Sequence, residues 1–91
     1  MRAVHVVITG RVQGVGYRSW CAREANRHGL SGWIRNRKSG EVEIVFSGSD
    51  ASLEQVLAIC AVGPGFARVD EVKVLGRAAQ VSGPFDIVET V

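Results

Sequence analysis

Residues 10–18 read GRVQGVGYR, a segment that combines three glycines with an arginine at its end. Glycine lets a backbone turn its amides inward and lets a ligand approach closely. A helix that begins after such a loop offers unpaired N–H groups and a partial positive charge to an anion. Arg18, at the expected start of a helix, adds a permanent cation that binds phosphate through two parallel hydrogen bonds. The segment therefore predicts a phosphate-binding loop.

The glycine pattern by itself leaves a second interpretation open. A plain glycine-rich connection followed by a surface arginine has the same spacing, because short glycine patterns also occur by chance. The segment matches neither common nucleotide-binding loop, since no Lys-Ser/Thr pair follows it and its spacing is not G-x-G-x-x-G. It also contains no acid, histidine, cysteine or serine, so the loop supplies no general acid, base or nucleophile.

The residues around the loop predict a strand before it and a helix after it. The β-branched run 4–9 favours a strand, and 18–28 favours a helix that Gly29 ends. A second helix is expected after Ser49 or Asp50, either of which can cap it, and Gly63-Pro64-Gly65 ends it. Its apolar side chains recur at the spacing of an amphipathic helix, at Leu53, Val56, Leu57, Cys60 and Ala61. The other expected strands span 33–37, 41–46, 69–75 and 85–91, with a hairpin turn over 38–40 in which Gly40 takes a positive φ.

This order of elements is that of the ferredoxin-like, split βαβ fold. We therefore expect one α+β domain over residues 1–91, with two helices on one face of an antiparallel sheet and an extra C-terminal strand. In strand 41–46, apolar residues alternate with Glu41, Glu43 and Val45. This alternation predicts that the strand has one core face and one wetter face.

Composition narrows the classes of function. The chain has 91 residues and a net charge of +2, and its basic residues do not form the stripe typical of nucleic-acid binders. No apolar run reaches the roughly 18 residues of a membrane span, and no signal peptide is recognisable. Cys21 and Cys60 form neither a CxxC pair nor a His/Cys cluster, so they are expected to be reduced apolar fillers. We expect a cytoplasmic monomer without a metal, a cofactor, a nucleic-acid partner or a membrane partner.

The whole pattern resembles the acylphosphatase family. GRVQGVGYR is followed by GLSGWIRN, SGEVEIVFSG, GPGFARVDEV and PFDI, so the similarity extends from about Val4 to Ile87. The resemblance implies that the loop amides and Arg18 bind the phosphate of an acyl phosphate, and that Asn36 holds the attacking water. The residues that it assigns to substrate binding are Gln13, Gly14, Val15, Gly16, Tyr17 and Arg18. The chain departs from many relatives in ending on VETV, where they have an aromatic or basic residue.

The chemistry of these residues fits that expectation. Phosphoryl transfer depends mainly on positioning and charge stabilisation. An alcohol leaving group needs a proton, whereas a carboxylate does not, because its conjugate acid has a pKa of about 4. Amides, Arg18 and Asn36 therefore suit an acyl phosphate better than a phosphate monoester. Asn36 shares strand parity with Ile34 and faces the helices if Ile34 does, although its spacing also fits an Asn that forms the turn of a hairpin.

Other features allow competing hypotheses. Cys21-x5-Arg27 has the spacing of a cysteine-phosphatase loop, but the stretch lacks glycine and is predicted to be helical. A phosphate-binding module without turnover is the main alternative, because a related domain occurs fused to larger carbamoyl-transfer maturation proteins. RNA binding is a third hypothesis, since RNA-recognition domains share this fold class, but their aromatic-rich strand pattern is missing.

Overall fold

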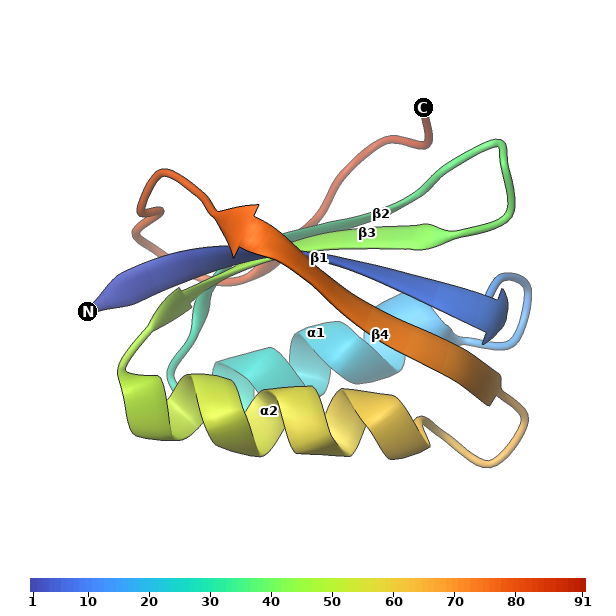
Figure 1. Cartoon of the computed structure of the whole chain (residues 1–91), viewed down its shortest axis with the longest axis horizontal. Coiled ribbons are helices and arrows are strands. Elements are labelled where there is room, and N and C mark those ends of the chain that lie inside the picture. Colours follow the sequence, from blue (N-terminus) through green and yellow to red (C-terminus); the bar gives the residue numbers. More distant parts are fainter.

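Five strands and two helices make up the computed structural model, which describes all residues from Met1 to Val91 (Figure 1). In chain order they are β1 (Arg2–Arg11), α1 (Tyr17–Arg27), β2 (Ser31–Asn36), β3 (Val42–Gly48), α2 (Asp50–Val62), β4 (Arg68–Arg77) and β5 (Asp86–Ile87). Each predicted element is present. The largest differences in length are that β1 and β4 are longer than expected and that β5 is shorter. No helix has the length and apolar character required to cross a membrane.

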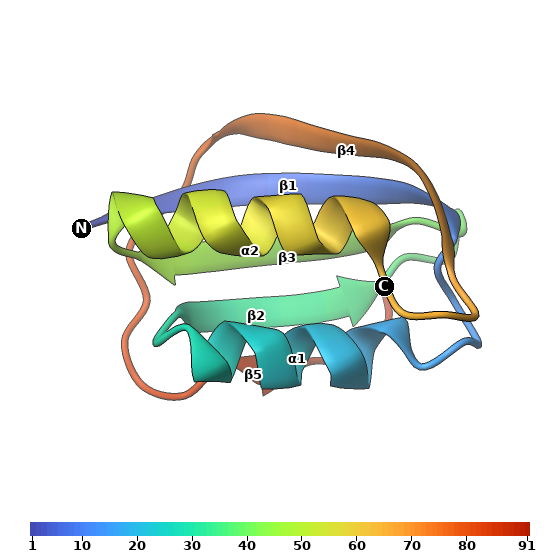
Figure 2. The same cartoon turned by 90° about the horizontal axis from the view of Figure 1, so that it is seen from below.

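The strands form one sheet in the order β4-β1-β3-β2-β5. The first four strands of this order are antiparallel to one another, and both helices cover one face of the sheet, as Figure 2 shows. The ferredoxin-like expectation is therefore confirmed. The sheet is mixed, however, and not antiparallel throughout, because β5 pairs with β2 in parallel.

The last strand differs most from the prediction. The chain leaves β4 and crosses to the start of β2 before it enters β5. Strands β2 and β5 therefore run in the same direction (Figure 1). Regular pairing covers only Asp86–Ile87 instead of 85–91. Backbone hydrogen bonds nevertheless continue past it, from the N–H of Val88 to the carbonyl of Ile34 at 2.9 Å and from Val91 to Asn36 at 3.1 Å. The VETV ending thus stays attached to the edge of β2.

The core lies between the sheet and the helices. Cys21 and Ala25 of α1 are fully buried, and so are Leu53, Val56 and Cys60 of α2. The stripe on α2 is the one that the sequence predicts, except that Ala61 is exposed. The sheet contributes an apolar layer whose fully buried members include Val6, Ile8, Ile34, Ile44 and Phe46.

Strand β3 does not have the wetter face that its alternation predicts. Glu43 and Val45 are each only 5% exposed, although both point away from the helices. Because β3 lies between β1 and β2, side chains of both neighbours cover its open face. Glu43 is held there by hydrogen bonds from His5, Arg35 and Arg37.

Candidate functional site

The loop between β1 and α1 carries a continuous run of unpaired amides. The first hydrogen bond of α1 runs from the N–H of Trp20 to the carbonyl of Gly16 at 3.1 Å. Every backbone N–H from Gln13 to Ser19 lacks an acceptor within the protein. Unpaired backbone donors at a helix N-terminus are a ready anion-binding site.

Two glycines give the loop its shape. Gly14 has a φ of +72° and Gly16 a φ of +80°, whereas no residue other than glycine has a positive φ. The sign of φ therefore alternates along residues 13–17, which is the backbone pattern of a concave nest for anions. A Cβ at Gly14 or Gly16 would meet no atom within 4 Å, so the backbone angles and not crowding require glycine here. Gly10, the third glycine of the segment, instead allows the close approach of the β4 backbone at Arg68.

Arg18 stands unpaired in the first turn of α1. It takes part in no ion pair, and the first turn contains no acidic residue and no side-chain cap. The helix dipole opposes a cation at this end of a helix. A cation without an anionic partner at this end of a helix therefore lowers the stability of the protein slightly.

Asn36 is the last residue of β2 and pairs with Val42 of β3. Strand alternation places it on the same face as Ile34, which is fully buried under the helices. Its side-chain oxygen Oδ1 is buried and has no hydrogen-bond partner in the protein. Buried acceptors are almost always paired, so such an exception requires an explanation. A hydrogen bond from a water or a substrate would satisfy this atom.

Three side chains of the loop contact other parts of the protein. Val15 packs partly buried against the core, and Tyr17 is buried with its hydroxyl donating to the carbonyl of Cys60 at 2.9 Å. Burial raises the pKa of Tyr17 far above its ordinary value, so the phenol is neutral. The side chain of Gln13 turns toward the β2–β3 hairpin, where its Nε2 donates to the carbonyls of Arg37 and Glu41. Sequence reasoning assigned only a backbone role to Gln13 and missed these side-chain bonds.

The cysteine-phosphatase hypothesis does not fit the structure. Cys21 lies inside α1 and is fully buried, with its Sγ 3.8 Å from the Sγ of Cys60 on α2. The hydrogen bond with Cys60, together with burial, raises the pKa of the Cys21 thiol. A neutral, buried thiol is a poor nucleophile, and residues 21–27 form a helix instead of an anion-binding loop.

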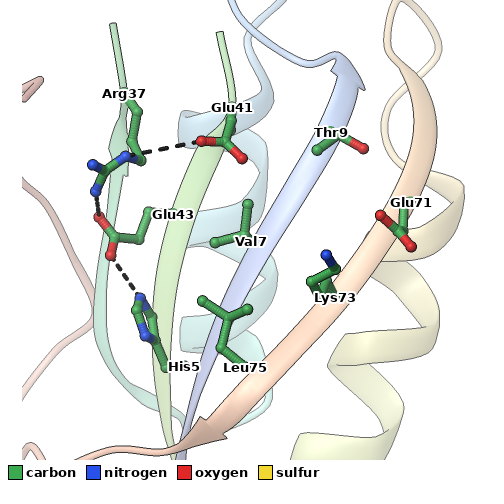
Figure 3. A pocket seen from close by; sticks show the side chains of 9 residues that line it. All are labelled: His5, Val7, Thr9, Arg37, Glu41, Glu43, Glu71, Lys73 and Leu75. Carbon is green, nitrogen blue, oxygen red and sulfur yellow. Dashed lines mark hydrogen bonds and ion pairs between the residues drawn. The ribbon is translucent and has the colours of Figure 1, made fainter. Parts of the chain in front are cut away.

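The larger surface hollow lies away from the loop, on the face of the sheet that the helices do not cover (Figure 3). Its polar and charged side chains come from β1, β3, β4 and the β2–β3 hairpin, and those of His5, Arg37, Glu41 and Glu43 form ion pairs or hydrogen bonds among themselves. Glu43 accepts hydrogen bonds from His5 at 2.6 Å, Arg35 at 2.7 Å and Arg37 at 3.0 Å. Arg35 and Arg37 are thus held in ion pairs with a buried carboxylate.

Unpaired loop amides, an arginine without an ion pair and a side-chain amide with an unpartnered oxygen make up a candidate anion-binding site on a ferredoxin-like fold. The acylphosphatase family model matches residues 4–87, and the chain belongs to the acylphosphatase family. The resemblance seen in the sequence is confirmed.

Relatives agree over most of the chain. The acylphosphatase of Nitrobacter winogradskyi is 52% identical over 68 residues, which cover 75% of this chain and 69% of the relative. That of Azorhizobium caulinodans is 46% identical over 89 residues, or 97% of this chain and 96% of the relative. The crystal structure of an acylphosphatase from Bacillus subtilis matches with a TM-score of 0.89 and 33% identity, covering 97% of this chain and 99% of the other.

Proposed function

We propose that this protein hydrolyses acyl phosphates to a carboxylate and inorganic phosphate without a metal ion. Membership of the acylphosphatase family supports the reaction class. The observation that carries the mechanism is that the protein has both hydrogen-bond donors without acceptors and a buried acceptor without a donor. The amides of residues 13–19 have no acceptor, and the buried Oδ1 of Asn36 has no donor.

In the proposed reaction, the loop amides of 13–18 and Arg18 bind the phosphoryl oxygens. Developing charge on these oxygens is stabilised by donors that are already in place, which is the main contribution available without an acid or base. Asn36 Oδ1 accepts a hydrogen bond from a water and orients it behind the phosphorus. The water oxygen forms a bond to phosphorus as the bond from phosphorus to the carboxylate oxygen breaks. The proton of the water passes to a phosphoryl oxygen, and the carboxylate leaves as an anion.

The leaving group explains why this site is sufficient. A carboxylate departs unprotonated at neutral pH because its conjugate acid has a pKa of about 4. Asn36 can therefore act by orientation alone. We further propose that the protein acts as a monomer in the cytoplasm on a small-molecule substrate. The candidate site is drawn entirely from one chain, which supports the monomer.

The test is hydrolysis of benzoyl phosphate by the purified protein in excess EDTA. We expect full activity in the wild type. Arg18→Ala is expected to weaken inhibition by inorganic phosphate and to remove nearly all turnover. Asn36→Ala is expected to retain phosphate inhibition and to lose turnover, because it removes the water ligand and not the phosphate ligands.

Arg23 provides a matched control, since it is an exposed arginine in the middle of the same helix. Arg23→Ala should leave both turnover and phosphate inhibition unchanged. A metal requirement, or wild-type turnover in Asn36→Ala, would contradict the mechanism. Phosphate binding without turnover in the wild type would favour a binding module instead.

A further inference from the structure

The side-chain amide of Gln13 connects the phosphate loop to the hairpin that carries Asn36. Its Nε2 donates one hydrogen bond to the carbonyl of Arg37 at 2.7 Å and a second to the carbonyl of Glu41 at 2.8 Å. Both protons of the amide are therefore used. The partners lie 24 and 28 residues away in the chain, so the contact joins separate elements.

The two carbonyls close the hairpin directly beyond Asn36. Glu41 O also accepts from the N–H of Arg37 at 2.9 Å, and Arg37 O accepts from the N–H of Gly40 at 3.0 Å. Gln13 thus fills the second acceptor position of each carbonyl. The neighbouring pair in the ladder is Asn36 with Val42, one residue further into the sheet.

The hairpin is held by two separate contacts. On the open face of the sheet, the side chain of Arg37 binds Glu43 at 3.0 Å (Figure 3). Gln13 binds the backbone of the same residue, at the end of the hairpin next to the loop. The Gln13 contact therefore ties the position of Asn36 to that of the loop.

We propose that Gln13 is a positioning residue that sets the separation between the bound phosphoryl group and the water on Asn36. The proposal rests on the function proposed above. In-line attack depends on that separation, and a misplacement of about 1 Å can cost on the order of 100-fold in rate. The backbone N–H of Gln13 belongs to the run of unpaired amides, so one residue supplies both a donor of the cradle and its link to the hairpin.

The geometry of the contact requires glutamine. Asparagine is one methylene shorter and cannot span the same gap, whereas glutamate has the length but no proton to donate when ionised. An ionised glutamate would also place its charge against two carbonyl oxygens. These differences allow the positioning role to be separated from simple loss of a side chain.

The experiment compares Gln13→Met and Gln13→Glu with the wild type in kcat, KM and inhibition by phosphate. For Gln13→Met, which keeps the length without donors, we expect kcat to fall about 10- to 100-fold. The inhibition constant of phosphate should change little, because the loop amides and Arg18 remain. A purely structural role would lower the melting temperature and leave the kcat of the folded protein intact.

Gln13→Glu adds a pH readout. At neutral pH its kcat should be as low as that of Gln13→Met. As the pH falls through the range in which the carboxyl takes up a proton, the acid regains one donor, and kcat should rise toward the wild-type value. The wild type has no titratable group at this position and should show no such rise. If Gln13→Met does not fold, this profile decides the question, and a flat profile overturns the proposal.

Gln55→Met is the matched control, because Gln55 is exposed on α2; its kinetic constants should equal those of the wild type. A folded Gln13→Met with kcat within twofold of the wild type would overturn the positioning role. So would equal losses in kcat and phosphate affinity. If the wild type turns over and Asn36→Ala is inactive in the same assay, such a result overturns only the role of Gln13 and leaves the proposed function standing. An inactive wild type overturns both proposals.

Discussion

Gly14 and Gly16 adopt positive φ angles in open space, at +72° and +80°. An L side chain reaches this region at a cost of roughly 1–2 kcal/mol. In Gly14→Ala or Gly16→Ala the loop can relieve that strain by rotating its amides out of the cradle. We expect the inhibition constant of phosphate to rise about tenfold, which corresponds to about 1.4 kcal/mol.

Gly29 is a control position that distinguishes the effect of backbone strain on stability from its effect on phosphate binding. It has a φ of +71° with equally open surroundings, but it follows the other end of α1. Gly29→Ala should lower the free energy of unfolding by a similar amount without any change in phosphate inhibition. The comparison measures the inhibition constant of phosphate and the free energy of unfolding in urea for Gly16→Ala and for Gly29→Ala. Unchanged phosphate inhibition in Gly16→Ala would mean that the loop does not bind phosphate through its amides.

At the scale of the elements, Glu43 joins β1, β2 and β3 on the open face of the sheet. Burial opposes ionisation of this carboxyl, but the hydrogen bonds from Arg35, His5 and Arg37 outweigh it and lower its pKa. An unfolded glutamate has a pKa of about 4.3. The ionised network therefore contributes its full stability above about pH 4.3 and loses it as the pH falls through the lower pKa of the folded state.

This linkage predicts the behaviour of Glu43→Gln. Its free energy of unfolding at pH 7 should be lower than that of the wild type by about 1–3 kcal/mol, as for hydrogen bonds to charged groups. Its further loss of stability in acid should be smaller than that of the wild type. Urea denaturation at pH 7 and near pH 3 measures both effects. Glu54→Gln, an exposed change on α2, should match the wild type at both pH values, and an equal acid loss in Glu43→Gln would contradict the assigned network.

The elements also show how far sequence reasoning extends. A β-branched run predicts β1 and helical spacing predicts α2, because these patterns report the preference of one segment and which of its faces is buried. The parallel direction of β5 and the burial of Glu43 depend on neighbours far away in the chain, and no local pattern carries that information. The loop was predictable because its glycines report a backbone requirement. Gln13 was missed because its partners are backbone carbonyls 24 and 28 residues away, which have no signature in the sequence.

At the scale of the whole molecule, the candidate site gathers at one end. Figures 1 and 2 place the β1–α1 loop, the β2–β3 hairpin and the α2–β4 connection at the same end of the sheet. Tyr17 joins the first and last of these, because its ring lies against Gly63 and its hydroxyl donates to the carbonyl of Cys60 at 2.9 Å. Pro64, four residues after Cys60, has no N–H to donate to that carbonyl in a continuing helix. The phenol of Tyr17 therefore satisfies a buried acceptor that α2 leaves open.

Tyr17→Phe tests this link between the helices. The change keeps the ring, its tilted contact with Trp20 at 5.3 Å and the backbone N–H, but it leaves the Cys60 carbonyl without a donor. An unsatisfied buried acceptor costs about 1–3 kcal/mol, and each kcal/mol lowers the melting temperature of a domain this small by roughly 4–8 °C. Calorimetry should therefore show a loss of several degrees, and Tyr17→Leu, which also removes the ring, should lose more. A melting temperature of Tyr17→Phe equal to that of the wild type would mean that the hydrogen bond to the Cys60 carbonyl does not stabilise the junction between the β1–α1 loop and the end of α2.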